Sequence, residues 1–558
     1  MAELRWGGVQ DEPGVPQTLQ AARVTTLLLD YKEILDRVCA WYHIWPLDSR
    51  LTDSCSQEEL PVEFIHRGKT PLSMVQFQRL FTTYREPGES CDTLRVIKPQ
   101  DHIVVIRRKQ HYVVPVYETQ RDGSKRRLCS REIEAMLHQI DGDSQRCEPA
   151  LGVGLLTAEE RPTWHRLRNE LLQASDTNKA SLAAIENSLF VLVLDKTNPK
   201  AEIDEFYHNT LAGDANDRWF DKAFNIIVYE DGEVGINAEH SPSEATVPNT
   251  ICEHVLTALR GIGRQDYPDA AALIPRGRSL PPPQRLHFDI PETVASALQV
   301  AERNYAKLRD NLVVSILHYF GYGTDWIKKN RLGPDSFVQM ALQLAYYRLH
   351  NTFVATYETG QTRQFNNGRT DTVRPCSVES AEFCRVMLDP AASDKQRAAA
   401  FGAALKTHSA YMAEVVAGNG FDRHLMGLRI IAAENGIEMP AIFTDPVYKR
   451  ATTFKLSTSN VPTRGIVNGG FGPVVPDGYG VCYQLYPKLL TINMYAVYAF
   501  VRSFARSCPT NSLLHRSTAN KDSNETDVIA FKHAVEQSFL DLKALIIGVR
   551  KTHPKAHL

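Results

Sequence analysis

The chain has 558 residues, of which 43% are hydrophobic and 23% are charged, and its formal net charge is -2. This composition is typical of a soluble globular protein, and the length allows two or more domains with large cores. The balanced charge argues against nucleic-acid binding, which usually needs a clearly basic face. The longest apolar runs, such as residues 188–194, are far shorter than the roughly 20 residues of a membrane helix. We therefore expect a soluble protein without a transmembrane segment and without a nucleic-acid partner.

The ten cysteines are scattered along the chain, without the paired spacing of a zinc site or a disulfide framework. We therefore expect no metal site and a reducing compartment. The first residues, MAELRWGGVQ, lack the apolar core of a secretory signal.

The first half of the chain mixes strand-like and helical stretches. Residues 102–118 and 188–194 have the composition of strands, whereas residues 160–175 have helical spacing. The G-x-G fragments in the chain lack the third glycine of a dinucleotide site, and no P-loop motif occurs. These observations predict an α/β protein that is not a Rossmann or P-loop enzyme.

Residues 225–240, NIIVYEDGEVGINAEH, predict a β-hairpin. Asp231 and Gly232 readily take the positive φ angles of a two-residue turn, and the second strand leads to His240. An imidazole at a strand end can act as a general base, and Glu244, four residues later, can bend back to orient it. For this fragment alone, a core histidine satisfied by a neighbouring carboxylate is the alternative.

Three consecutive prolines, Pro281 to Pro283, mark the clearest break in the chain, because proline forbids helix and favours an extended connector. We therefore expect an N-terminal domain over residues 1–288 and a C-terminal domain over residues 289–558.

The second half begins with helical spacing and ends with strands. Long helices are predicted over residues 292–319 and 334–347. Late strands, with a Gly/Pro-rich loop at 471–481 among them, are predicted over residues 453–460, 480–486 and 489–497.

The chain ends in Ala556, His557 and Leu558, a small-basic-leucine tripeptide of the kind that directs proteins to peroxisomes. We expect a peroxisomal protein, or otherwise a cytoplasmic one, with a mitochondrial location left open.

Five separated motifs occur in one order along the chain: DRWFDKAFNIIVYEDGEVGINAEH, TYETGQTRQFNNGRTDTVR, FDRHLMGL, LSTSNV and FGPVVPDGYGV. Together they resemble the choline/carnitine acyltransferase family, across nearly the whole chain. The resemblance implies two related α/β domains similar to chloramphenicol acetyltransferase, each a mixed sheet covered by helices, with an active-site tunnel between them.

The resemblance also implies catalytic roles. His240 is the general base, because one imidazole near neutral pKa can deprotonate either a thiol or a hydroxyl. Glu244 orients it, although many relatives have aspartate there. Ser459, in the Ser-Thr-Ser run, donates a hydrogen bond to the negative oxygen of the transition state.

Carnitine differs from choline in its carboxylate, which a buried guanidinium can bind in a bidentate way. The family's carnitine users have an arginine that its choline users lack, and here it is Arg423. The resemblance completes the expected carnitine site with Tyr357, Thr359, Thr370 and Ser457.

The segment WIKKNRLGPD resembles the family's coenzyme A segment. Thr324 and Ser409 stand where short-chain relatives often have lysine and arginine, so the phosphates are held more weakly or differently. The expected coenzyme A residues are Lys328, Lys329, Arg331, Asp335 and Asn460.

Acyl-chain length is expected to depend on Gly469. Short-chain relatives typically have methionine there, which closes the pocket, whereas medium- and long-chain relatives have glycine. The alternative is that Gly469 and Gly470 only supply positive φ angles in a strand-edge bulge.

The sequence therefore predicts a monomeric carnitine O-acyltransferase that transfers a medium-chain acyl group between coenzyme A and carnitine, with no bound cofactor or metal. The alternatives are a short-chain (acetyl) carnitine or choline acyltransferase and a non-catalytic acyl-carnitine or coenzyme A binding relative. The last is considered because the match begins near residues 21–36, after a helical segment that leads the relatives.

Overall fold

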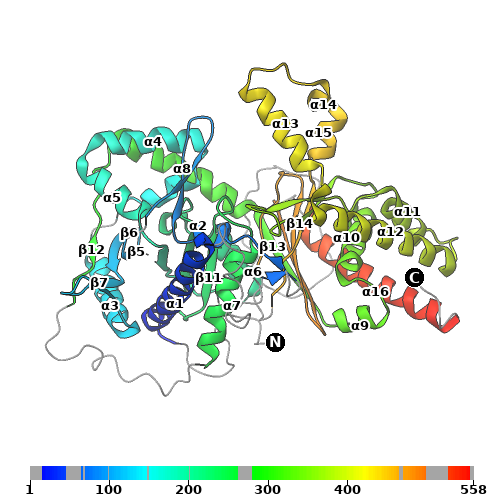
Figure 1. Ribbon diagram of the computed structural model, residues 1–558, viewed down its shortest axis with the longest axis horizontal. Coiled ribbons are helices and arrows are strands. Elements are labelled where there is room, and N and C mark those ends of the chain that lie inside the picture. The colour runs from blue at the N-terminus through cyan, green and yellow to red at the C-terminus, as the bar shows by residue number, and fades with distance from the viewer. Residues whose placement is uncertain are drawn as a thin grey trace, which may run out of the picture. The chain divides into compact units, whose positions relative to one another are not determined.

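The computed structural model describes residues 15–44, 65–66, 70–98, 100–147, 150–199, 202–261, 280–463, 469–497 and 526–552. The chain divides into two compact units, the first formed by Met1–Asp310 and the second by nearly all of the remainder. Each unit is built on one six-stranded mixed sheet that helices cover (Figure 1). The predicted α/β class with two such domains is confirmed. Within the described ranges, no helix is both long and apolar enough to cross a membrane.

The sheet of unit 1 has the strand order β11-β10-β9-β5-β6-β12. Its three central strands, β5, β9 and β10, run parallel, and the others pair antiparallel. The strand bounds are β5 (His102–Arg107), β6 (Gln110–Pro115), β9 (Val191–Leu194), β10 (Phe224–Val228), β11 (Val234–Ala238) and β12 (Gln284–Arg285).

Helices cover both faces of this sheet. Along β5, Ile103 and Val105 belong to one buried cluster, and Val104 and Ile106 belong to another. The period of two in a strand sends alternate residues to opposite faces, so an apolar run buries both sides. The first cluster contains α1 (Gln17–Ile44), α3 (Ser130–Arg146) and α7 (Thr246–Gly261), and the second contains α4 (Arg161–Ala174), α5 (Asp176–Glu186) and α8 (Glu292–Asn311).

The remaining elements of unit 1 are short. They are β1 (Ile65–His66), β2 (Thr70–Pro71), α2 (Val75–Arg79), β3 (Thr83–Glu86), β4 (Thr93–Val96), β7 (Tyr117–Thr119), β8 (Lys125–Arg127) and α6 (Ile203–Ala212), with 3-10 turns at Val153–Ala158 and Ala215–Asp217.

The region between the two halves differs from the prediction. The helix expected over 292–319 ends at Asn311, and β13 (Leu312–Tyr319) follows it directly. Helix α8 packs in unit 1, where Val294 and Leu298 are buried, so the expected boundary at residues 288/289 lies earlier than the division seen after Asp310. The predicted connector after the prolines also forms β12, which pairs with β6.

The sheet of unit 2 has the order β13-β18-β17-β16-β14-β15. Read from β15, its pairings are antiparallel, parallel, parallel, antiparallel and antiparallel, the same series that unit 1 shows when read from β11. Its other strands are β14 (Thr356–Gln361), β15 (Thr370–Val373), β16 (Leu456–Asn460), β17 (Tyr479–Leu485) and β18 (Leu490–Val497).

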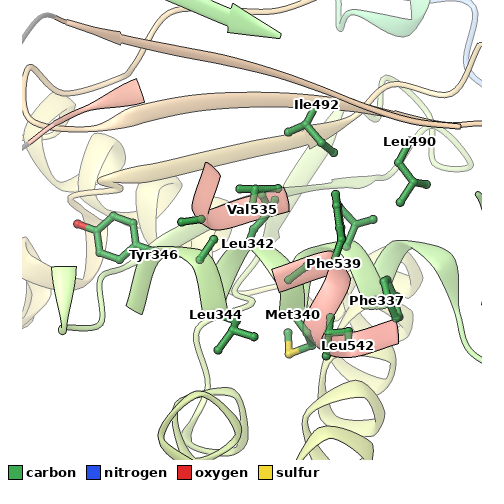
Figure 2. Close-up of a cluster of buried hydrophobic side chains, with 14 of the residues drawn as sticks. Phe337, Met340, Leu342, Leu344, Tyr346, Leu490, Ile492, Val535, Phe539 and Leu542 are labelled. Atoms are coloured by element: carbon green, nitrogen blue, oxygen red, sulfur yellow. The ribbon is translucent and has the colours of Figure 1, made fainter. Parts of the chain in front are cut away.

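One face of this second sheet packs on helices. Figure 2 shows Phe337 and Leu342 of one helix beside Phe539 of another, with Ile492 of β18 above them. The helices of unit 2 are α9 (Thr324–Lys329), α10 (Pro334–His350), α11 (Val378–Leu388), α12 (Asp394–Glu414), α13 (Asp422–Glu434), α14 (Ala441–Thr444), α15 (Pro446–Thr452) and α16 (Val528–Thr552), with a π turn at Val415–Asn419.

Candidate active site

The β10-β11 hairpin carries His240, as predicted, but its turn has three residues rather than two. Tyr229 N–H donates to Glu233 O at 2.9 Å, which leaves residues 230–232 as the loop. Only Gly232 has a positive φ, at 84°, and Asp231 does not. This is the hairpin type in which a turn is followed by a glycine in the left-handed region.

His240 and Glu244 lie together after β11, as the sequence predicted. His240 Nε2 is 3.7 Å from Glu244 Oε2, and the histidine side chain is 70% exposed whereas the glutamate is 15% exposed. The exposed ring argues against a histidine buried in the core. The distance suits an ion pair once the ring is protonated and is too long for a strong hydrogen bond. The acid can therefore stabilise an imidazolium that forms during a reaction.

Four of the predicted residues of unit 2 share one face of its sheet. Tyr357 of β14 pairs with Ser457 of the parallel strand β16. Two residues further on, Thr359 Oγ1 donates to Ser459 Oγ at 3.4 Å. The period of two in a strand places all four side chains on the face opposite Glu358 and Thr458. The structure thus brings the predicted oxyanion donor and three predicted carnitine residues together.

Thr370 and Arg423 extend this group. Arg423 lies in the first turn of α13, and its Nε donates to the carbonyl oxygen of Thr370 at 3.4 Å. Its own N–H donates to Asp371 Oδ1 at 3.2 Å, which caps the helix. Gly420 permits this approach, because a Cβ there would lie 2.3 Å from Asp371 Oδ2. The guanidinium is exposed in the structure, whereas the sequence argument assumed a buried one.

Asp335 and Asn460, both expected to contact coenzyme A, contact each other. Asn460 Nδ2 donates to Asp335 Oδ1 at 2.9 Å, and the hydroxyl of Tyr483 donates to the same oxygen at 2.7 Å. Asp335 lies in the first turn of α10, after Pro334, on the helix-covered side of the sheet.

The expected phosphate-binding cations lie at the end of α9. Lys328, Lys329 and Arg331 are all exposed. Thr324 is buried and its N–H donates to Tyr486 O at 2.9 Å, whereas Ser409 shares a 2.9 Å hydrogen bond with Ser336. Thr324 and Ser409 add no positive charge, so the expected phosphate-binding cations are Lys328, Lys329 and Arg331.

A buried pair behind the β14-β16 face was not predicted. His408 Nε2 lies 2.6 Å from Glu358 Oε2, and both side chains are almost fully buried. Burial raises the pKa of Glu358, against the hydrogen bond from His408. Burial lowers the pKa of His408, but Glu358 outweighs it and the net direction is upward. The Glu358–His408 pair therefore holds its shared proton firmly. From the sequence, the alternation of side chains along a strand could have indicated that Glu358 faces away from Tyr357.

Oxygen and nitrogen atoms of Asp335, Glu358 and His408 lie within 4.8 Å of one another, which is a possible metal-ligand set. These atoms are already engaged, since His408 Nδ1 also contacts Ser336 Oγ at 2.9 Å and Asp335 accepts two hydrogen bonds. The arrangement is accounted for by internal pairing, and it braces α10 and α12 against β14 and β16.

Gly469 has no close neighbour among the residues that the structure describes. No heavy atom of the described chain lies within 4 Å of a Cβ built there, and its carbonyl oxygen accepts from Asn493 Nδ2 at 2.8 Å. Gly470, the second glycine of the pair, does not have a positive φ.

A surface cavity of about 630 Å³ lies elsewhere in unit 2, beside the end of α10. Tyr346, Phe353, Arg450 and Lys455 are among the residues that line it, and none of the predicted site residues does. The tripeptide predicted to be a peroxisomal signal, Ala556 to Leu558, lies outside the described residues.

Comparison with known proteins extends these observations. The family described as Choline/Carnitine o-acyltransferase matches residues 9–512. The chain is 33% identical to carnitine O-acetyltransferase of Mus musculus, over 96% of this chain and 78% of that protein. It is 34% identical to peroxisomal carnitine O-octanoyltransferase of Bos taurus (88% and 76%) and 34% identical to choline O-acetyltransferase of Danio rerio (76% and 67%).

Similarity to solved structures is weaker. The epimerization domain of tyrocidine synthetase B, TycB3(E), gives a TM-score of 0.30 at 10% identity and covers 65% of this chain and 81% of that chain. The wax ester synthase/diacylglycerol acyltransferase from Marinobacter aquaeolei VT8 gives a TM-score of 0.28 at 9% identity, over 64% and 79% of the two chains. Scores this low support no further argument.

Proposed function

We propose a specific reaction for this chain, which belongs to the choline/carnitine O-acyltransferase family. The family match confirms the resemblance drawn from the five motifs, and the protein is an acyltransferase with coenzyme A as co-substrate. The proposed reaction is the reversible transfer of a medium-chain acyl group between coenzyme A and the hydroxyl of carnitine. The observation that carries the choice of carnitine is Arg423 beside Thr370.

In the proposed mechanism, His240 takes the proton of the carnitine hydroxyl as its oxygen attacks the thioester carbonyl carbon. The carbon-sulfur bond then breaks, and the sulfur leaves with the proton that the imidazolium returns. In reverse, the same imidazole deprotonates the thiol. Glu244, 3.7 Å from the ring, is proposed to orient the imidazole in both directions.

The proposed oxyanion donor is the hydroxyl of Ser459. Its neighbour Thr359 donates to Ser459 Oγ at 3.4 Å, which leaves the serine proton available for the substrate oxygen. Tyr357, Ser457 and Thr370 line the carnitine side of the same sheet face in this proposal. The guanidinium of Arg423 pairs with the carnitine carboxylate, which choline lacks.

Coenzyme A is proposed to place its phosphates near Lys328, Lys329 and Arg331. Asp335 and Asn460 then meet the adenine or pantetheine part. The three cations are exposed, so a phosphate group in solution can reach them.

The test is a thiol-release assay with acyl-coenzyme A and either carnitine or choline. Release that depends on carnitine supports the proposal. Release with choline alone favours the choline alternative, and no release with either favours a binding protein without catalysis. The similar proteins include both a carnitine O-acetyltransferase and a choline O-acetyltransferase. The assays with carnitine and with choline are therefore run in parallel.

The acyl group is proposed to be octanoyl or longer, because glycine occupies position 469, where short-chain relatives typically have methionine. Each methylene that gains a dry slot contributes about 0.8 kcal/mol, so several carbons change catalytic efficiency by orders of magnitude. We expect Gly469→Met to lower kcat/KM for octanoyl-coenzyme A by about 100-fold relative to acetyl-coenzyme A. The control is Gly142→Met, on α3, where a Cβ also meets no neighbour. An acetyl optimum in the unaltered enzyme would refute the open pocket.

The proposed location is the peroxisome. A fluorescent reporter that ends in the last four residues, Lys555 to Leu558, is expected to collect in peroxisomes, because the receptor reads the terminal tripeptide. The matched reporter has Leu558 removed and is expected to stay in the cytosol. A diffuse signal from both reporters would count against the address.

A further inference from the structure

The turn that carries His240 is held on both sides by residues far away in the sequence. Before the histidine, Glu239 N–H donates to Ala223 O at 3.0 Å, and the Glu239 carboxylate accepts from Ser241 N at 3.0 Å. After it, Glu244 N–H donates to the side-chain oxygen of buried Gln76 at 2.7 Å. The backbone on both sides of the exposed imidazole is therefore held by hydrogen bonds.

Arg85 of β3 connects this turn to the rest of unit 1. Its Nη1 lies 3.4 Å from Glu239 Oε2, and its Nε donates to Asp92 Oδ2 at 2.5 Å. Its backbone N–H donates to Asp221 O at 2.8 Å. The short bond to Asp92 fixes the plane of the guanidinium, and the remaining edge then points at Glu239.

A second arginine supports the first. Arg161 Nε contacts the same Asp92 oxygen at 2.7 Å, and its Nη1 contacts Asp221 Oδ1 at 2.7 Å. Trp164 Nε1 donates to the other Asp221 oxygen at 2.7 Å. Burial raises the pKa of Asp221 to about 6, against the charge of Arg161. Burial also opposes ionisation of Asp92, but Gly88 N–H, Arg161 and Arg85 outweigh it and lower the pKa of Asp92.

The charges alternate along this array, from Glu239 through Arg85, Asp92 and Arg161 to Asp221. Such a network is stiffer than an isolated surface ion pair, because each charge is held by more than one partner. Glu239, at one end of this network, is the residue directly before His240. A base that must reach a reacting proton loses rate steeply when it is misplaced by about 1 Å.

We propose that Arg85 is a positioning residue for catalysis, which holds the turn of His240 in place through Glu239. The inference rests on the proposed role of His240 as the base. It assigns no contact between Arg85 and substrate, so the expected effect is on turnover and not on substrate affinity.

The experiment compares Arg85→Gln, Arg85→Lys, Glu239→Gln and the double variant Arg85→Gln/Glu239→Gln with the unaltered protein. Glu239→Gln keeps the Arg85–Asp92 pair, so it tests the tether even if Arg85→Gln weakens folding. The control is Arg95→Gln, on the partner strand β4, because Arg95 pairs with Glu86 and not with the turn. The readouts are kcat, both KM values and hydrogen-deuterium exchange of peptides that cover residues 236–246.

We expect kcat to fall about 10-fold in Arg85→Gln, with both KM values within about 2-fold of the unaltered protein. The kcat of the double variant falls no further than that of Arg85→Gln, because Arg85 and Glu239 act as one unit. Arg85→Lys recovers only part of the rate, since one ammonium cannot contact Asp92 and Glu239 together. Exchange over residues 236–246 becomes faster in Arg85→Gln and Glu239→Gln and is unchanged in Arg95→Gln.

Unchanged exchange in this segment, additive losses in the double variant or an unchanged kcat would each overturn the proposal. The exchange comparison needs no substrate. An inactive unaltered protein therefore contradicts the proposed function, whereas the exchange result still decides whether Arg85 holds the turn.

Discussion

His240→Ala is expected to lower kcat for acyl transfer by at least about 1,000-fold while coenzyme A binding persists. The general base acts only on the proton of the attacking group, and the nucleotide part of coenzyme A contacts other residues in the proposed complex. Stopped assays with carnitine give the rate, and calorimetric titration with coenzyme A gives the affinity. A variant that keeps a near-normal rate would show that another group is the base.

The chain offers a close control for this variant. His138 on α3 lies 3.7 Å from Glu134, four residues earlier, and is 53% exposed, so this pair has the same separation as His240 and Glu244. His138→Ala is expected to leave the rate within about 2-fold, because surface substitutions outside a site have small effects. The comparison separates the position of the histidine in the fold from the mere presence of a histidine-glutamate pair.

The fold class could be predicted because buried strands leave a clear pattern. The run at residues 102–118 became the hairpin β5-β6, and its turn uses Arg108 and Lys109 at positive φ angles of 52° and 64°. The junction after α8 could not be predicted in the same way. No glycine or proline separates α8 from Leu312–Tyr319, and pairing with β18 over eight residues decides that this segment is a strand.

In the candidate site too, some residues could be predicted from the sequence and others could not. His240, Ser459 and Arg423 could be found because they occur in local motifs. The residues that support them could not, because their partners are distant in the chain: His408 is 50 residues from Glu358, and Glu239 is 154 residues from Arg85. Such pairs depend on how the strands assemble, and spacing within a motif carries no signal for them.

The proposed recognition of carnitine depends on how α13 is attached to the rest of unit 2. Asp422, next to Arg423, accepts two bonds from Arg374, at 3.0 and 2.6 Å. Arg374 also donates to Ala451 O at 2.7 Å, so it joins the end of the β15 segment to α13 and α15. The position of the Arg423 backbone is thereby fixed, while its guanidinium remains exposed and able to meet an anion.

Arg423→Asn is therefore expected to raise the KM for carnitine by about 10- to 100-fold and to leave the KM for acyl-coenzyme A within about 2-fold. A hydrogen bond to a charged group contributes about 1.5–3 kcal/mol, and each 1.4 kcal/mol is tenfold in affinity. The matched control is Arg429→Asn, also exposed on α13, which has no proposed ligand. Because choline has no carboxylate for Arg423 to bind, the preference for carnitine over choline should fall by the same factor. An equal rise in both KM values would mean that Arg423 supports the site as a whole and does not bind the carboxylate.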